Sequence, residues 1–115
     1  MRNMSFSMTT EAVRERRKTV TRRLGWWNLQ PGTVLQAVEK AQGLKKGEHV
    51  KPICLIRVVS IRQEYVWHLL GYTAGETARE GFPELDASGF IEMFCTANRC
   101  DGSVLVNRIE FEYVG

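Results

Sequence analysis

The chain has 115 residues, of which 43% are hydrophobic and 25% are charged, and these values are typical of one globular domain. Its apolar runs are far shorter than the ~20 residues that span a bilayer, and its first residues lack the apolar core of a secretory signal peptide. We therefore expect a single soluble, cytoplasmic domain over residues 1–115, without membrane contacts. The net charge of +3 is unevenly divided: residues 1–62 hold 13 Lys and Arg against 4 Asp and Glu, whereas residues 63–115 hold 3 against 9.

Three segments in the first part of the chain have the alternating or β-branched pattern of strands. They span residues 4–8, 19–23 and 33–39. Thr9 and Thr10 are suited to cap a short helix between the first two of these strands, ending near Arg17. A turn at residues 31–32 precedes the third strand, and a basic loop at residues 43–47 follows it.

The second part of the chain begins with the segment most typical of a strand, residues 53–61, which is β-branched and mostly apolar. The segments predicted after it are a further strand over 65–70, a short helix or turn over 76–80, and a helix over 86–98. Asp86 is suited to cap this last helix. The final strand covers residues 104–113, where apolar positions change from even to odd numbers and so indicate a bulge near Asn107.

These elements occur in mixed order, with five or six short strands, two or three helices and no regular alternation of strand and helix. A parallel sheet built from repeated strand–helix–strand units is therefore not expected. We predict an α+β fold, namely a small β-barrel of mostly antiparallel strands with the helices packed on it.

The cysteine pattern predicts neither a metal site nor disulfide bonds. Cys54 lies in an apolar run and is predicted to be a small core residue. Cys95 and Cys100 have no second pair nearby, and His49 and His68 are distant from them in sequence. A four-ligand zinc site needs closely spaced pairs of ligands, and a cytoplasmic domain needs no disulfide. No metal and no cofactor are predicted.

Residues 14–23 form the most strongly charged segment, with six Lys or Arg side chains and one Glu. This density of cations favours contact with an anion such as phosphate, unless the acidic second half neutralises it or it forms a solvated helix end. Trp26 and Trp27 follow and offer flat surfaces for stacking of bases, although at least one of them is expected in the core. The residues predicted to contact a nucleic acid or nucleotide are Arg17, Thr19, Arg22, Arg23, Trp26 and Trp27.

Lys18 and Thr21 form a second candidate group within this segment. A lysine acts as a general base only if burial or neighbouring cations lower its pKa, and five arginines lie within five positions of Lys18. A threonine hydroxyl beside such a base is a candidate nucleophile. Residues three apart on a strand point to opposite faces, so the two side chains converge only if Lys18 lies at a helix end or on a turn.

Two motifs carry a resemblance to a known family. The first is Lys-Thr-Val-Thr-Arg-Arg at residues 18–23, between a short helix and a Pro-Gly-Thr-Val turn. The second is Ala-Arg-Glu-Gly-Phe at residues 78–82, with Ser-Gly-Phe at 88–90 and an aromatic-bearing helix after it. Together they resemble the ASCH domain family, which belongs to the PUA-like superfamily of RNA-associated small β-barrels. The matching pieces span residues 3–113 in the expected order.

The resemblance implies a basic, aromatic cleft that binds RNA, a nucleoside or a nucleotide. Some bacterial ASCH proteins are amidohydrolases that remove the acetyl group from N4-acetylcytidine, and their catalytic lysine, threonine and glutamate match Lys18, Thr21 and Glu80. The resemblance then implies that Thr21 attacks the amide carbonyl and that Lys18 transfers the proton. Glu80 orients the lysine or handles the leaving amine. The structural alternative for Glu80 is a salt bridge to an arginine of the basic segment.

The sequence also departs from those amidohydrolases. Their motif reads Lys-Thr-Ile-Thr-Ile-Arg, and Val20 and Arg22 replace the two isoleucines here. The Thr-Arg-Arg version is common in phage and prophage ASCH proteins. The alternatives are therefore a ribonuclease, as reported for a related ASCH protein, and a non-enzymatic phage-type protein that sequesters a nucleotide, an RNA or a host partner. A ribonuclease needs a general acid and base, for which His49 and His68 are the candidates.

Overall fold

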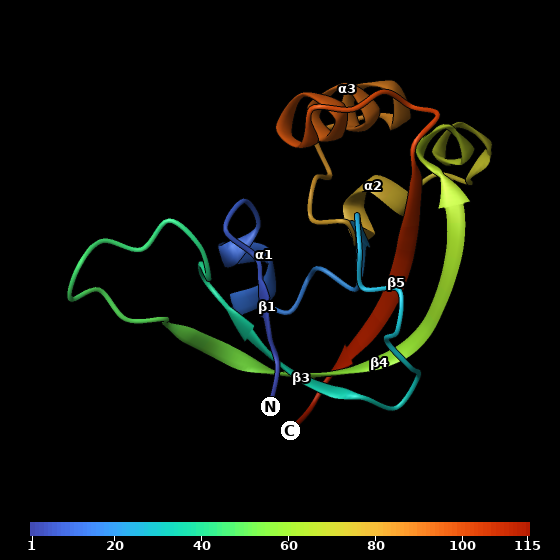
Figure 1. Ribbon diagram of the computed structural model, residues 1–115. Helices are drawn as coiled ribbons and strands as arrows, with labels where there is room; N and C mark the ends of the chain where they lie inside the picture. Colours follow the sequence, from blue (N-terminus) through green and yellow to red (C-terminus); the bar gives the residue numbers. More distant parts are fainter.

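The computed structural model describes all 115 residues and is built on one five-stranded mixed sheet (Figure 1). The strands are β1 (Asn3–Ser5), β2 (Val20–Arg23), β3 (Val34–Val38), β4 (Pro52–Tyr65) and β5 (Leu105–Tyr113). They lie in the order β1-β3-β4-β5-β2. The pair β1–β3 is parallel and the other three pairs are antiparallel. The predicted α+β class with mostly antiparallel strands is confirmed.

The sheet is strongly curved but not closed, so the small β-barrel expected from the sequence is an open one. In Figure 1 the long strand β4 bends along its length, which brings the sheet into a half-barrel. The two edge strands, β1 and β2, form no backbone ladder with each other. A side chain links them instead, because Arg23 Nη2 donates to the main-chain oxygen of Ser5 at 2.6 Å.

Four helical segments pack on one end and one side of this sheet (Figure 1). They are α1 (Thr10–Arg14), the 3-10 helix η1 (Val66–Gly71), α2 (Glu76–Arg79) and α3 (Ala87–Asn98). The predicted cap of α3 is confirmed, since the Asp86 carboxylate accepts from the Gly89 N–H at 2.7 Å. None of these helices is long and apolar enough to cross a membrane.

Two of the elements predicted from the sequence need correction, one helix and one strand. The first helix stops at Arg14 instead of continuing to Arg17, because Arg16 has a φ of 61° and turns the chain away from the helical path. The strand predicted over residues 65–70 is also wrong, because β4 continues to Tyr65 and η1 follows it. In η1 the buried side chains, Val66 and Leu69, are three residues apart, which is the period of a 3-10 helix.

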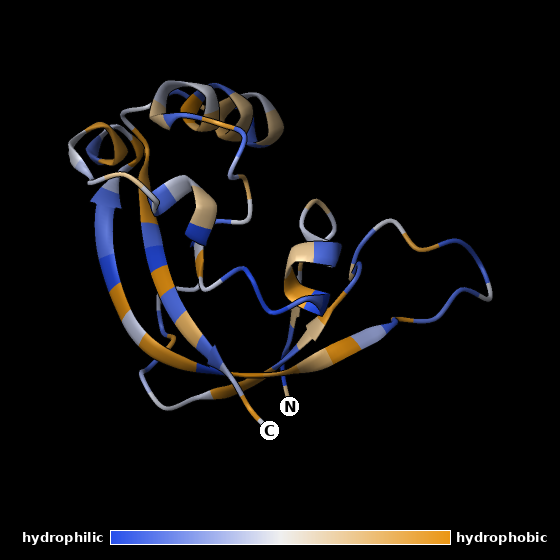
Figure 2. Ribbon diagram, turned by 180° about the vertical axis from the view of Figure 1, so that it is seen from behind, coloured by the Kyte–Doolittle hydropathy of each residue, from blue (hydrophilic) through white to orange (hydrophobic).

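The predicted bulge near Asn107 is also wrong, since β5 pairs without interruption on both sides of that residue. The irregularity lies in β4, between Val58 and Ser60. The even-to-odd change of apolar positions in β5 has another cause: its two faces contact different cores. Val106 packs against the helices, whereas Ile109 packs against the other strands. Figure 2 shows hydrophilic segments of β5 between its apolar ones.

These cores are two clusters of buried side chains. The strand cluster comprises Met4, Phe6, Val13, Leu29, Leu35, Ala37, Ile56, Val58, Ile109 and Phe111. The helix cluster comprises Val66, Leu69, Phe90, Phe94 and Val106. The predicted core residue Cys54 lies at the margin of the strand cluster and is only partly buried.

The turn before β5 contains Gly102, against which the indole ring of Trp67 packs. A Cβ at Gly102 would lie 1.6 Å from the indole Nε1 of Trp67, and the main-chain N–H of Trp67 donates to the Gly102 carbonyl at 3.0 Å. Gly102→Ala must therefore displace the indole, and we expect the free energy of unfolding to fall by about 1–3 kcal/mol. Urea unfolding measures this loss. Gly71→Ala is the matched control, because nothing lies within 4 Å of a Cβ there, and equal stability of the two variants would contradict the prediction.

Candidate functional site

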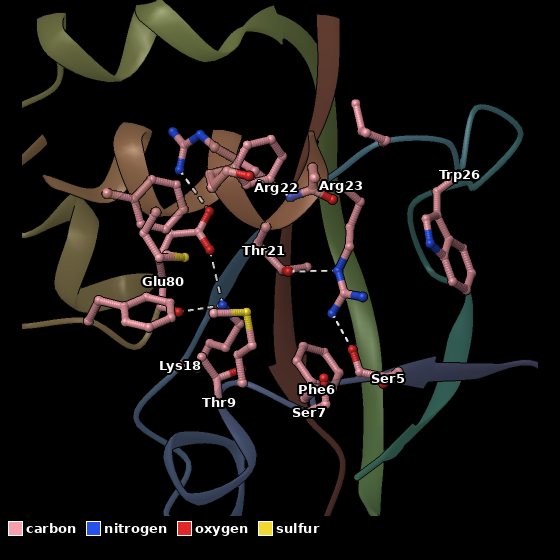
Figure 3. Close-up of a pocket in the computed structure, with 18 of the residues that line it drawn as sticks. Ser5, Phe6, Ser7, Thr9, Lys18, Thr21, Arg22, Arg23, Trp26 and Glu80 are labelled. Atoms are coloured by element: carbon pink, nitrogen blue, oxygen red, sulfur yellow. Dashed lines mark hydrogen bonds and ion pairs between the residues drawn. The ribbon is translucent and has the colours of Figure 1, made fainter. Parts of the chain in front are cut away.

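A cavity of about 520 Å³ lies between β2, the segment that follows α2, and the helix α3. Its lining comes from residues 5–9 and from some of the residues in the segments 18–26, 80–82 and 90–98, together with Gln42 from the loop between β3 and β4. Figure 3 shows the polar side chains of Lys18, Thr21, Arg23 and Glu80 in this cavity, with aromatic rings around them. The cavity thus joins both motifs singled out in the sequence.

Lys18 lies on a turn before β2, which is the condition that the sequence set for its convergence with Thr21. The main-chain N–H groups of Arg17 and Lys18 both donate to the Ala12 carbonyl, at 2.8 and 3.3 Å, so the chain winds tightly after α1. The Tyr113 hydroxyl donates to the Lys18 carbonyl and holds it from β5. Lys18 and Thr21 are both buried, and both line the cavity.

Glu80 reaches Lys18 because the segment after α2 approaches α1 closely. The Thr19 N–H donates to the Arg79 carbonyl at 2.9 Å and joins the two motifs through the backbone. Gly81 has a φ of 96°, and a Cβ there would lie 3.1 Å from Thr9 Cγ2 and 3.2 Å from Ala12 Cβ. Glycine is therefore required at this crossing.

The carboxylate of Glu80 is shared between two cations. Lys18 Nζ donates to Oε1 of Glu80 at 3.0 Å and also to its main-chain oxygen. Arg22 Nη1 donates to Oε2 at 3.0 Å. The salt bridge considered for Glu80 therefore exists, and it includes the lysine as well as an arginine.

Behind this pair lies a buried ion network, in which Glu64, Glu76 and Arg108 take part although the sequence did not single them out. Arg22 Nη2 donates to Glu76 at 2.7 Å and lies 3.3 Å from Glu64. Arg108 donates to both oxygens of Glu76, at 2.8 and 3.1 Å. With Lys18 and Glu80 the network holds three buried cations and three buried carboxylates. The uneven charge of the chain is thus partly neutralised inside the fold, where basic residues of the first half meet acids of the second.

The network shifts the ionisation of its members. Burial lowers the pKa of Lys18 and outweighs the opposing effect of Glu80, and the nearby Arg23 and Arg22 lower it further. Burial acts to raise the pKa of Glu76, but the hydrogen bonds from Arg108 and Arg22 prevail and lower it to about 2. Lys18 therefore loses its proton more readily than an exposed lysine, while Glu76 stays charged.

Thr21 is held from the other side by Arg23. Arg23 Nε donates to Thr21 Oγ1 at 2.9 Å, and the guanidinium lies 4.8 Å from the centre of the Phe6 ring. Burial lowers the pKa of Arg23 to about 10. Because the Thr21 oxygen already accepts this bond, its own proton is free to be donated elsewhere.

The other predicted contact residues divide between the cavity and the surface. Trp26 lines the cavity and packs against the strand cluster, with the Arg2 guanidinium 4.2 Å from its ring centre. Trp27 is exposed, and Arg17 pairs with Glu15 in solvent at 2.6 Å. Thr19 also lies outside the cavity. The structure therefore brings together Lys18, Thr21, Arg22, Arg23, Trp26 and Glu80, but not Arg17, Thr19 or Trp27.

The remaining candidates are also distant from the cavity. Neither His49 nor His68 contributes to its lining. The three cysteines are free, and no group of three or more His, Cys, Asp or Glu side chains lies together as a metal site requires. The cavity also has an aromatic wall, formed by Phe82, Phe90 and Phe94.

No family model matches the sequence, and no curated protein sequence matches it either. The structure is similar to that of a DUF984 protein from Enterococcus faecalis V583, with a TM-score of 0.57 and 16% identity over 94% of this chain and 68% of that one. It is also similar to an ASCH domain from Lactobacillus crispatus JV V101, with a TM-score of 0.53 and 16% identity over 97% and 79% of the two chains. The protein therefore has the fold of an ASCH domain.

Proposed function

We propose that the cavity binds an acylated nucleoside and that Lys18, Thr21 and Glu80 hydrolyse its amide. N4-acetylcytidine is the substrate that the resemblance to ASCH amidohydrolases implies. A volume of about 520 Å³ is within the range of small-molecule sites. Phe82, Phe90 and Phe94 supply apolar surface against which a flat base can pack.

The hydrogen bonding of Lys18 is the observation that carries this proposal. Its nitrogen donates to two acceptors, the carboxylate and the main-chain oxygen of Glu80. In the neutral form the amine has two N–H groups, both of which would be satisfied by Glu80, and its lone pair would then be free. Together with the lowered pKa of Lys18, this arrangement supports a general base in the cavity that Thr21 also lines, and the proposal assigns it the hydroxyl proton of Thr21.

The reaction then proceeds in two halves. Thr21 Oγ1 forms a bond to the acyl carbon while Lys18 takes the hydroxyl proton. The C–N bond breaks as Lys18 returns this proton to the leaving nitrogen, which frees cytidine and leaves an acetyl ester on Thr21. Water then attacks the ester with Lys18 as base. The proton passes to Thr21 Oγ1 as the ester bond breaks, and acetic acid leaves.

The test is incubation of the protein with N4-acetylcytidine and chromatography for cytidine. Lys18→Met and Thr21→Val are each expected to lower the rate by about 10²–10⁴-fold, since each removes an acid–base or nucleophilic group of the reaction. The matched controls are Arg57→Met and Thr73→Val, because both residues are exposed and lie outside the cavity. Turnover that survives both active-site substitutions would exclude this mechanism.

Nucleic-acid binding without catalysis is the second candidate function. The loop between β3 and β4 carries four exposed lysines and extends to the cavity through Gln42. These lysines are Lys40, Lys45, Lys46 and Lys51. An RNA strand held by this loop would bind more weakly as salt rises. Anisotropy titration of a labelled single-stranded RNA measures this, and the absence of binding at low salt would remove this candidate.

A further inference from the structure

One cation of the cavity has no carboxylate partner. Lys18 pairs with Glu80, and Arg22 pairs with three glutamates. Arg23 forms no salt bridge, and its two hydrogen bonds go to uncharged oxygens, those of Thr21 Oγ1 and the Ser5 carbonyl. Since the buried network behind it is already balanced, Arg23 is an excess positive charge at the cavity.

This charge is costly for the protein alone. The Arg23 side chain is partly buried, and an ion removed from water without a counter-ion loses hydration that neutral acceptors only partly replace. The lowered pKa of Arg23 reflects this desolvation, which outweighs the opposing charge of Glu80. With a pKa of about 10 the guanidinium is nevertheless protonated at neutral pH. Arg23 is therefore a cation that lines the cavity, and a bound ligand can supply the anion that the protein does not.

The guanidinium is also fixed and partly unused. Thr21, Ser5 and the Phe6 ring hold it in one orientation, so little side-chain entropy is lost when a ligand binds. Its Nη1 nitrogen makes no hydrogen bond with the protein. In Figure 3 Arg23 lies on the opposite side of Thr21 from Lys18, toward Trp26. A ligand can therefore contact Lys18 with one end and Arg23 with the other.

We propose that Arg23 binds an anionic oxygen group of the ligand, of the phosphate or carboxylate class, at the end of the cavity opposite Lys18. For a nucleoside ligand this makes the substrate a nucleotide and not the uncharged nucleoside. The identity of the base rests on the proposed function, whereas the anion site rests on the unpaired guanidinium. Arginine suits this task because its planar fork of donors matches the oxygens of both anions.

Calorimetric titration tests the proposal with cytidine, cytidine 5′-monophosphate and cytidine 5′-carboxylate. We expect at least one of the two anions to bind the wild-type protein about 10-fold or more tightly than cytidine, as charge-assisted hydrogen bonds do; which one does so identifies the anion. Arg23→Gln should remove this preference and leave the affinity for cytidine within about threefold. Arg57→Gln should retain it, because Arg57 lies on the exposed side of β4, paired with Glu112. Equal binding of all three compounds, or a preference that survives Arg23→Gln, overturns the proposal.

Arg23 also links β1 to β2, so Arg23→Gln can impair folding. Arg23→Lys keeps the charge and removes the fork, and it should weaken the preference without abolishing it. Inorganic phosphate provides a probe independent of nucleosides. At constant ionic strength it should raise the melting temperature of the wild-type protein and of Arg57→Gln, but not that of Arg23→Gln.

The two proposals fail in different ways. Stabilisation by phosphate that depends on Arg23, without hydrolysis of N4-acetylcytidine or its 5′-monophosphate, supports the anion site and rejects the amidohydrolase. Hydrolysis of N4-acetylcytidine with the same kcat/KM as its 5′-monophosphate rejects the anion site and supports the amidohydrolase.

Discussion

Replacing Glu76 with glutamine is expected to lower the free energy of unfolding by about 3 kcal/mol. Glu76 is buried and accepts hydrogen bonds from both Arg22 and Arg108. Glutamine keeps the size of the side chain but removes the charge that these two guanidinium groups neutralise. A buried cation left without its partner is among the most costly single changes in a folded protein. Urea unfolding at pH 7 measures the difference.

The effect of Glu76→Gln on the free energy of unfolding is also expected to depend on pH. The pKa of Glu76 falls from an ordinary value of 4.5 to about 2 in the folded protein. The ionised Glu76 side chain therefore makes its full contribution to the free energy of unfolding above pH 4.5. This contribution is lost as the pH falls toward 2. The stability difference between the wild-type protein and Glu76→Gln should therefore shrink over this range. Glu84→Gln is the matched control, since Glu84 is exposed, and it should change stability by less than about 0.5 kcal/mol. A difference that does not change with pH would contradict the assignment.

Arg22→Met is expected to raise the pKa of Lys18. Arg22 occupies one oxygen of the Glu80 carboxylate and lowers the pKa of Lys18 through its own charge. Without it, the full charge of Glu80 faces the lysine, and a protonated lysine is then favoured. Carbon-13 NMR titration of the lysine ε-carbons measures this directly, because the chain has only five lysines. The Lys18→Arg variant assigns the resonance of Lys18.

The control for this experiment is Arg57→Met, which removes an arginine from the exposed side of β4. It should leave the Lys18 titration unchanged. If the protein hydrolyses acylated cytidine, Arg22→Met should also move the rising limb of the rate profile to higher pH, because less Lys18 is then neutral at pH 7. An unchanged Lys18 titration in Arg22→Met would show that the arginine does not tune the lysine.

The parts of the fold that follow from the sequence are those with local causes. Asp86 caps α3 through its own side chain, and the apolar, β-branched residues of β4 indicate a strand without any knowledge of their neighbours. The parts that do not follow depend on distant contacts. In β5 the side on which Val106 packs is decided by η1 and α3, and no local pattern distinguishes this from a bulge.

In the candidate site, too, some residues could be identified from the sequence and others depend on distant contacts. The resemblance singled out Lys18, Thr21 and Glu80, which all line the cavity. The density of cations around Arg22 left two alternatives open, an external anion or acids of the second half, and the structure shows the second for Arg22, whose partners are three glutamates. Arg108 lies opposite Arg22 in the sheet. Two like charges in register indicate that carboxylates lie near them, but the register itself was unknown from the sequence.

The way β5 is shared between the two clusters has a consequence for cooperativity. Ile109 and Phe111 belong to the strand cluster, while Val106, only three residues before Ile109, belongs to the helix cluster. The same strand pairs with β4 on one side and β2 on the other. If β5 detaches, both clusters lose side chains at once, so neither is an independent unit of stability. Heat or denaturant should therefore melt the sheet and the helices in a single transition.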